Sequence, residues 1–314
     1  MTSSKTDALP LLPPPRVLVV GDVMTDILVR PEGPIIPGSD RRAKIGVLPG
    51  GSACNQAAWL AYRGVPVALA GKVGRRDADE QARALAAAGV TPRLGIDETR
   101  ETGMLVAIIS EGGERSFLTD RGANDSLSNE DLPFSMLAGL DLLHVSGYAL
   151  VAPGPRAAVM SLMAVARARG IAVTVDPSSV GFLEEVGRDN FLGWTRDASI
   201  LFPNADEAAF LSGSTEPREQ ARFLTERYQT VAVKRGPLGA EVATSELLLK
   251  AVPPAVEVID TTGAGDAFLA GFLAARLGGA GLEHCLAEGV KAGAEATTRL
   301  GGRPPPRVSS ETAS

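Results

Sequence analysis

The chain has 314 residues, enough for one large α/β domain or two ordinary ones, with 45% hydrophobic and 22% charged residues. Its formal net charge of −6 argues against a nucleic-acid partner, and no apolar run approaches the roughly 20 residues that would span a membrane. Two cysteines and two histidines exclude disulfide frameworks and histidine-rich metal sites, so we expect a protein of the reducing cytoplasm that relies on carboxylates, amides and backbone groups.

Short β-branched runs alternate with Ala- and Leu-rich helical stretches, a pattern typical of a parallel sheet with helices on both faces. The Pro-rich stretches 1–15 and 304–314 are predicted to be a disordered lead and a tail around one domain over 16–303. Strands are predicted at 17–20, 65–70, 142–146, 172–175, 199–202, 230–233 and 256–259. Helices are predicted at 53–63, 80–88, 155–169, 206–211, 217–227 and 266–277. We expect His144, inside the apolar run LDLLHVSGY, to be a buried strand residue.

Two regions break this alternation. Residues 23–49 are an extended stretch punctuated by Pro and Gly, and residues 102–120 predict a β-hairpin with its turn at 111–114. Strands in place of expected helices indicate a small second sheet. We therefore predict a lid, built from about 23–49 and 100–121, over the sheet edge where open α/β sheets bind ligands.

The stretch IDTTGAGD, residues 259–266, joins the predicted strand 256–259 to an apolar helix. Gly263, Ala264 and Gly265 would let a phosphate approach the unpaired amides at the start of this helix. Asp266 could then take a proton from a substrate hydroxyl. By itself the motif is equally consistent with a structural turn. A P-loop motif is absent, and Phe268 stands where a Rossmann motif needs its third glycine.

A second glycine cluster begins at residue 49. Gly50 and Gly51 allow close approach of the backbone to a ligand. Asn55 opens the next predicted helix with a donor and an acceptor, which suits a polyhydroxylated ligand, although its spacing alone favours a helix cap.

Together these stretches resemble the ribokinase-like (PfkB) family of carbohydrate kinases over residues 16–303. The first signature is the GG-x-x-x-N-x-A pattern starting at Gly50, followed by the glycine-rich run from Gly71 to Asp77. The second is D-T-x-G-A-G-D-x-F, from Asp260 to Phe268. Two such signatures in this order are specific, and they favour the functional interpretation of 259–266. The segments FPNADEAAFLSG (202–213) and VAVKRGPLGA (231–240) also match the family.

The resemblance implies a three-layer α/β/α sandwich with a mostly parallel central sheet and a small β-sheet lid. It implies that Asp266 is the general base and that the amides from Gly263 through Ala264 and Gly265 form an anion hole. ATP would be bordered by Lys234, Gly236, Gly239 and Asn204. Mg²⁺ would be organised by Asn204 and Glu207 through water, although the same pair could be a helix cap with a first-turn acid. An activating monovalent cation such as K⁺ would bind at Asp260 and Thr262.

On the acceptor side, the resemblance implies sugar contacts from Asp26, Gly50, Gly51 and Asn55. Three further candidates follow, two of which carry structural alternatives. Asp22 could equally cap a strand end, and Arg121 could simply pair with Asp120 or Asp125 on the surface. Asn124 follows it in RGAND, after the predicted hairpin.

This sequence departs from ribokinase at the acceptor side. Met24 stands where ribokinase typically carries Asn, and Ser52 where it often carries Lys. The region of Ser146 and Gly147 stands where ribokinase has its acidic sugar contact. Ribose is therefore in doubt, and Met24 could line an apolar slot for a nucleoside base or belong to the core.

The leading hypothesis is an ATP-dependent kinase that phosphorylates a primary hydroxyl of a small sugar such as ribose. An adenosine-type nucleoside kinase of the same fold is the alternative. A non-catalytic sugar-binding protein is disfavoured because the base, the glycine turn and the metal residues are all intact. An exposed hairpin edge at 102–120 favours pairing between lids, so we expect a homodimer.

Overall fold

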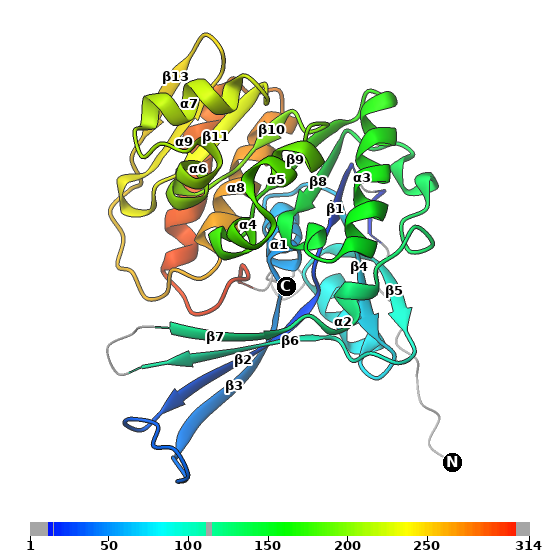
Figure 1. The fold of residues 1–314 in the computed structure, drawn as a ribbon, viewed down its shortest axis with the longest axis vertical. Helices are drawn as coiled ribbons and strands as arrows, with labels where there is room; N and C mark the ends of the chain where they lie inside the picture. The colour runs from blue at the N-terminus through cyan, green and yellow to red at the C-terminus, as the bar shows by residue number, and fades with distance from the viewer. Residues whose placement is uncertain (1–11, 15, 111–114, 306–314) are drawn as a thin grey trace, which may run out of the picture.

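The computed structural model describes residues 12–14, 16–110 and 115–305 (Figure 1). The predicted lead and tail, and the predicted hairpin turn at 111–114, therefore lie wholly or largely outside the described residues. No helix in the described part of the chain is long and apolar enough to cross a membrane.

The main sheet has nine strands in the order β13-β12-β11-β10-β9-β8-β1-β4-β5. Neighbours from β11 to β5 pair in parallel, whereas β12 and β13 add an antiparallel edge. Their bounds are β1 Val17–Val20, β4 Val67–Gly74, β5 Val90–Asp97, β8 Leu142–Ser146, β9 Ala172–Asp176, β10 Ile200–Leu201, β11 Thr230–Lys234, β12 Ala240–Ala243 and β13 Leu248–Ala251.

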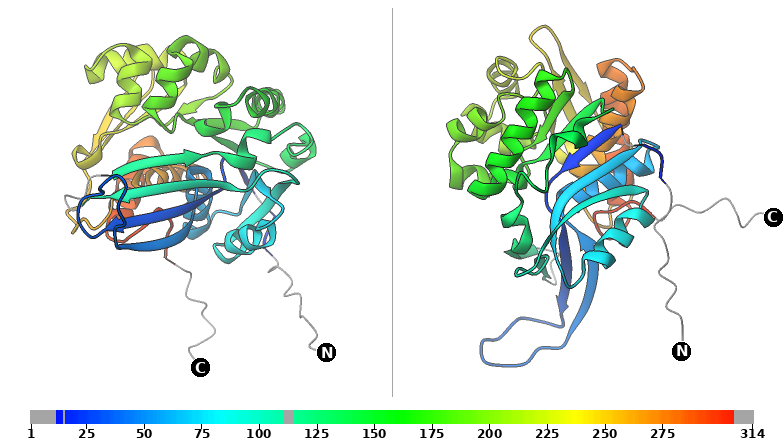
Figure 2. Two further views of the ribbon diagram at one scale, coloured as in Figure 1. Left: turned by 60° about the horizontal axis from the view of Figure 1, so that its bottom comes forward. Right: turned by 90° about the vertical axis from the view of Figure 1, so that its right-hand side faces the viewer.

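Helices cover both faces of this sheet, which gives the three layers (Figures 1 and 2). One apolar cluster packs α1, α2, α8 and α9 on one face, and a second packs α3 to α7 on the other. Strand β1 shows why its sequence is apolar throughout: Val17 and Val19 join the first cluster, Leu18 and Val20 the second. The bounds are α1 Ser52–Tyr62, α2 Ala78–Ala87, α3 Pro153–Ala168, α4 Val180–Val186, α5 Arg188–Trp194, α6 Ala205–Ser212, α7 Pro217–Thr225, α8 Ala264–Leu277 and α9 Leu282–Thr297.

A four-stranded sheet in the order β3-β2-β6-β7, named here the lid sheet, projects from the main body (Figure 1). Its strands are β2 Met24–Pro31, β3 Ala43–Gly50, β6 Gly103–Ile109 and β7 Arg115–Asp120. The prediction of a second sheet from these two segments is confirmed. The predicted hairpin is the antiparallel pair of β6 and β7.

The predicted strand at 256–259 is wrong. The chain has no regular structure at 252–258 after β13, and Val258 and Ile259 are 60% and 57% exposed. The β-branched residues there suggested a core strand, but the sheet ends with the β12–β13 hairpin. Prolines at 253 and 254 also oppose continued pairing.

Several elements were not predicted, namely β5, β12, β13, α4 and α5. Helix α9 contains glycines, which lower helix propensity. One of them, Gly289, is required by packing, since a Cβ there would lie 2.8 Å from the ring of Phe268 on α8. Close contact between α8 and α9 thus explains why a glycine stands inside a helix.

Candidate active site

The N-terminus of α8 lies beside a large cavity. Gly263 precedes the helix with φ of 74°, a left-handed conformation that favours glycine. A Cβ on Gly263 would also lie 2.5 Å from Gly302, so the turn and the C-terminal segment 299–305 pass in direct contact. Ala264 N–H donates to the Thr261 carbonyl at 3.3 Å, and the amides that follow belong to the positive end of the helix dipole.

Asp266 is held from the side by helix α1. Its Oδ1 accepts a hydrogen bond from Ser52 Oγ at 2.8 Å, and its Oδ2 accepts one from Asn55 Nδ2 at 3.3 Å. Burial, and then the nearby Asp176 carboxylate, raise the pKa of Asp266 to about 7, against the lowering effect of Ser52, Lys234 and Asn55. A carboxylate with this pKa is suited to accept a proton near neutral pH.

A chain of hydrogen bonds continues from Asp266 into the core. Gln56 Nε2 donates to Ser52 Oγ at 3.0 Å, and Gln56 Oε1 lies 3.0 Å from His144 Nε2. Because an amide oxygen only accepts, Nε2 of His144 carries the proton, and Nδ1 faces Thr174 Oγ1 at 2.8 Å. Burial lowers the pKa of His144 to about 4, so it is neutral. The prediction of a buried strand histidine is confirmed.

Charged side chains converge where β9 and β11 end. Lys234 Nζ lies 2.6 Å from Asp176 Oδ2. Burial alone would lower the pKa of Lys234, but the surrounding carboxylates, chiefly Asp176 and Glu207, outweigh it and raise the pKa. The carboxyl ends of parallel strands meet at one sheet edge, which explains why these residues lie together.

Asn204 and Glu207 form the helix cap that was one of their two interpretations. Asn204 Oδ1 accepts from Glu207 N–H at 2.9 Å, and Glu207 Oε2 accepts from Asn204 N–H at 2.8 Å. Burial is the largest cause that raises the pKa of Glu207 to about 7. Both residues also line the large cavity, so the cap holds them at its wall.

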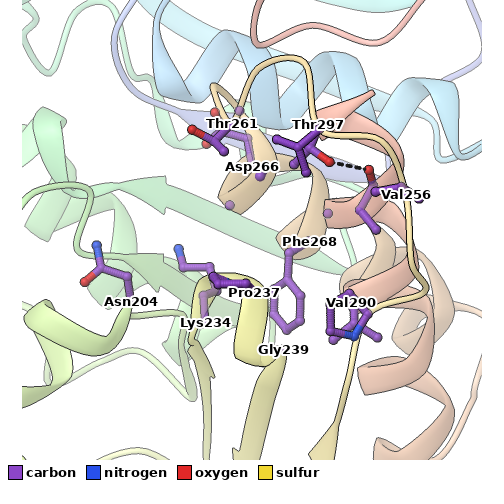
Figure 3. A pocket seen from close by; sticks show the side chains of 18 of the residues that line it. Asn204, Lys234, Pro237, Gly239, Val256, Thr261, Asp266, Phe268, Val290 and Thr297 are labelled. Atoms are coloured by element: carbon purple, nitrogen blue, oxygen red, sulfur yellow. Dashed lines mark hydrogen bonds between the residues drawn. The ribbon is translucent and has the colours of Figure 1, made fainter. Parts of the chain in front are cut away.

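This cavity has a volume of about 940 Å³ and combines a polar end with apolar walls (Figure 3). Asp266, Lys234 and Asn204 lie at the polar end, and Val256 and Val290 lie along the opposite side. The predicted turn glycines line it too, Gly236 with φ of 55° and Gly239 with φ of 90° among them. Such a cavity can hold a flat apolar group and a multiply charged group at once.

Asp26 of β2 and Asn55 of α1 lie on the lid side of Asp266. A Cβ on Gly50 would lie 2.0 Å from the Asp26 carboxyl group, so glycine is needed there. Asp26 Oδ1 and Asn55 Oδ1 are buried and have no hydrogen-bond partner among the described residues. Burial, and then Asp22, raise the pKa of Asp26 to about 6, while Arg303 opposes the shift. The lid side of Asp266 thus holds two buried acceptors without a partner.

Three predicted substrate contacts are engaged by the protein itself. Asp22 accepts from the amides of Ser52 at 3.1 Å and Ala53 at 3.4 Å, so it caps α1, and a Cβ on Gly51 would lie 2.6 Å from its carbonyl oxygen. Asn124 bonds to the N–H and the C=O of Val23, both at 2.9 Å.

Arg121, the third of these predicted contacts, is also bonded to other residues of the protein. It pairs with Asp125 at 2.8 Å and donates to the carbonyl of Tyr148. Met24 is 3% exposed, with its sulfur 3.3 Å from Asn124 Nδ2, so it is a core residue rather than the lining of a slot. These side chains satisfy backbone groups where the chain crosses between the two sheets.

Asp260 connects the turn before α8 to the C-terminal segment. Its Oδ1 accepts from Thr262 N–H at 2.7 Å and its Oδ2 accepts from Gly301 N–H at 3.0 Å. Asp260 and Thr262 line a second cavity of about 460 Å³, together with Asp26 and Arg303.

Sequence reasoning missed four residues of the site, Ser52, Gln56, Asp176 and Arg303. Asp176 had a usable signal, because it directly follows a predicted strand, where ligand-binding residues gather. Ser52 was noted only as a departure from ribokinase. Arg303 had no local signal, since it lies in a Pro-rich stretch at the end of the predicted domain.

The chain is similar to known proteins over nearly its whole length. The model described as "pfkB family carbohydrate kinase" matches residues 14–308. An ATP-dependent ribose-1-phosphate kinase from Halopiger xanaduensis is 30% identical over 93% of this chain and 95% of its own. The structure of adenosine kinase from Sinorhizobium meliloti aligns with a TM-score of 0.85 at 26% identity, covering 93% of this chain and 96% of that one. A putative ribokinase II from E. coli, in complex with ATP and Mg²⁺, aligns with a TM-score of 0.81 at 26% identity, covering 92% and 94%.

Proposed function

The chain belongs to the pfkB family of carbohydrate kinases, phosphotransferases that act on hydroxyl groups, and from this premise we propose that it transfers the γ-phosphoryl group of ATP to a primary hydroxyl of a small sugar such as ribose. One observation carries the proposal. Asp266, with a pKa near neutrality, stands in the first turn of α8 at the polar end of the 940 Å³ cavity.

In this mechanism Asp266 accepts the proton of the acceptor hydroxyl as its oxygen attacks the transferred phosphoryl group. Ser52 and Asn55 hold the carboxylate in place through the bonds to its two oxygens. The amides that follow Gly263 stabilise the charge that develops on the phosphoryl oxygens. The apolar walls at Val256 and Val290 suit the adenine of ATP, as the similarity to an ATP-bound ribokinase II supports.

Mg²⁺ fits this site as an ion held largely by water and by the nucleotide. Within the described residues there is no cluster of three or more His, Cys, Asp or Glu side chains that could form a protein cage. Mg²⁺ commonly uses one or two carboxylates and substrate phosphates, so Glu207 and Asn204 at the cavity wall would suffice, with water between. When bound, Mg²⁺ neutralises charge on the transferred group.

A monovalent cation such as K⁺ at Asp260 and Thr262 is a further part of the proposal. These residues connect the turn before α8 to the C-terminal segment, so a cation there would brace the anion hole. Replacing KCl by choline chloride at constant ionic strength should then lower kcat. Equal rates in the two salts would remove K⁺ from the proposal.

We also propose a homodimer formed through the outer face of the lid sheet. Side chains alternate along a strand, so the face opposite Asp26 is apolar. Ile45, Val47 and Leu118 are 65%, 64% and 62% exposed, a patch that a second copy would cover. Its members are Ile27, Val29, Ile45, Val47, Val106, Ile108 and Leu118. Sedimentation should give a dimer that Val47→Asp converts to a monomer, and a monomeric native protein at micromolar concentration would refute it.

The cysteines are consistent with a reducing compartment. Cys54 and Cys285 are both buried free thiols. Burial raises the pKa of the Cys54 thiol to about 12, which keeps it protonated and unreactive. On this basis the proposal places the enzyme in the cytoplasm.

A nucleoside kinase is the second candidate, favoured by the similarity to an adenosine kinase structure at a TM-score of 0.85. Against it, Met24 is buried and lines neither the 940 Å³ nor the 460 Å³ cavity. The two candidates make the same phosphoryl transfer and differ only in the acceptor.

An ADP-release screen with ATP and Mg²⁺ against pentoses, hexoses, sugar acids, sugar phosphates and nucleosides tests both. Turnover with one sugar that Asp266→Asn abolishes would support the proposal, and turnover confined to nucleosides would select the alternative. Undiminished turnover in Asp266→Asn would mean that another group is the base. Sugar binding without ADP release would support a non-catalytic protein.

A further inference from the structure

Arg303 is held beside the acceptor site by the segment that precedes it. Gly301 N–H donates to Asp260 at 3.0 Å, and the carbonyl of Gly302 accepts from Trp59 Nε1 at 2.9 Å. A Cβ on Gly302 would lie 2.4 Å from Asn55 Nδ2, so the backbone passes directly over this side chain. These contacts fix the backbone next to Asn55, and so they fix the position from which the Arg303 side chain extends.

The guanidinium of Arg303 reaches the lid side of α1. It is near enough to Asp26 and to Cys54 to lower the pKa of each, against the larger effect of burial. It lines the 460 Å³ cavity together with Asp26. Its Nε and Nη2 atoms are nevertheless buried without a hydrogen-bond partner among the described residues.

These two nitrogens form one edge of the guanidinium, with two parallel N–H groups. Such an edge matches two oxygens of a carboxylate or a phosphate. Leaving a buried charged donor unbonded is costly, so this edge calls for a partner. Asp26 does not supply it, because neither nitrogen has a partner within the described chain, and Asp26 Oδ1 lacks one as well.

The unpaired atoms together describe a ligand. Asp26 Oδ1 and Asn55 Oδ1 accept, so they call for hydroxyl groups that donate. The Arg303 edge donates twice, so it calls for a planar or tetrahedral group with two anionic oxygens. Asp266 marks the hydroxyl that reacts. A neutral sugar would satisfy the acceptors but would offer the Arg303 edge only uncharged hydroxyl oxygens, which are weaker partners than a carboxylate or a phosphate.

We propose that the acceptor is an anionic sugar, whose carboxylate or phosphate group binds the Nε–Nη2 edge of Arg303 while its hydroxyls meet Asp26 and Asn55. This inference rests on the proposed kinase function and narrows its substrate class. Arg303 is then a specificity-determining residue that contacts the substrate away from the reacting hydroxyl.

The test compares matched acceptors and variants by steady-state kinetics. The acceptors are neutral pentoses and hexoses, the corresponding sugar acids and the corresponding sugar phosphates. Arg303→Gln removes the charge and the edge, and Arg303→Lys keeps only the charge. Arg83→Gln, an exposed arginine on α2, is the control.

Wild-type protein should prefer one anionic class, and that class identifies carboxylate or phosphate as the group bound. Arg303→Gln should raise KM for this acceptor by about 10- to 100-fold, the usual worth of a charge-assisted hydrogen-bonded pair, with kcat nearly unchanged. Arg303→Lys should fall between, because a lysine cannot bind two oxygens in parallel. KM for ATP should not move in any variant.

Equal kcat/KM for neutral and anionic acceptors in wild type would overturn the inference. So would an equal loss for both classes in Arg303→Gln. Asp266-dependent ADP release confined to neutral sugars would uphold the kinase function while refuting the anionic acceptor. If no acceptor is turned over, thermal denaturation with each sugar measures binding instead. Anionic sugars should raise the Tm of Asp266→Asn but not the Tm of the double variant Asp266→Asn with Arg303→Gln. Equal Tm shifts in these two variants would refute the inference.

Discussion

The two halves of the site differ in how their polar groups are satisfied. In the donor half, the cavity around Lys234 and Asn204, the polar groups already have partners. Lys234 pairs with Asp176 at 2.6 Å, and Asn204 and Glu207 make two reciprocal hydrogen bonds. In the acceptor half, around Asp26 and Arg303, buried oxygens and nitrogens have no partner within the described chain.

The donor half is built on the ends of adjacent strands and on a helix N-terminus, which are rigid elements of the main sheet. The acceptor half is assembled from the lid sheet, α1 and the C-terminal segment. The difference indicates that the donor half is preformed for a constant ligand, whereas the acceptor half leaves its strongest interactions to the substrate. Specificity therefore lies in the acceptor half.

Asp266 lies between the two halves, and its loss should have the largest effect. Asp266→Asn keeps the size of the side chain but removes the base, so kcat should fall by about 10²- to 10⁴-fold. Affinity for ATP, measured by calorimetry, should change little. Asp206→Asn, an exposed acid on α6, should leave kcat intact. A normal kcat in Asp266→Asn would contradict the assignment of the base.

Lys234→Met should disrupt the paired charges of the donor half. It leaves the buried carboxylates of Asp176 and Glu207 without their cation, which should lower the free energy of unfolding by about 3 kcal/mol. KM for ATP should rise while KM for the acceptor stays. Urea denaturation and kinetics measure both, with the exposed Lys291→Met as control. Unchanged stability would mean that the pairing at Lys234 contributes little.

Asp26→Ala should affect the acceptor half alone. Loss of a charged acceptor for a sugar hydroxyl should raise the acceptor KM by about 10- to 100-fold. KM for ATP should stay near that of the native enzyme, because Asp26 does not line the donor cavity. Asp40→Asn, at an exposed turn of the lid sheet, is the control. Equal changes in the two KM values would contradict the division of the site into a donor half and an acceptor half.

The pH dependence of kcat should report Asp266. Its pKa is raised to about 7, so it is protonated and inactive as a base below that pH. At saturating substrates kcat should fall about tenfold per pH unit below 7 and level off above it. A profile that is flat between pH 5 and 8 would show that Asp266 titrates lower or is not the base.

The smallest effect should come from the chain that leads to His144. Gln56→Leu removes the donor to Ser52 Oγ and loosens the Ser52 bond to Asp266. We expect kcat to fall several-fold, both KM values to hold, and the pKa in the kcat profile to rise. Ser161→Ala, on the exposed face of α3, is the control. An unshifted profile would limit Gln56 to a role in packing.

The sequence by itself determined the framework. Strands such as β1 and β8 are predicted by apolar runs, because a strand buried on both faces of a sheet needs apolar residues throughout. Helix α3 is predicted by the helical spacing of its apolar residues. The pairing of Gly263 with Asp266 could be predicted because the cap residue and the first turn of α8 are close together in the chain.

Tertiary structure decided the rest. Val256 to Ile259 look like a strand, yet no strand of the sheet accepts them. Asn124 looked like a ligand contact, yet it satisfies the backbone of Val23 from 101 residues away. Ser52 reaches Asp266 across 214 residues, and Arg303 reaches Asp26 from the opposite end of the chain. Local pattern specifies which element forms, whereas the partner of a polar side chain depends on which distant segments the packed core brings beside it.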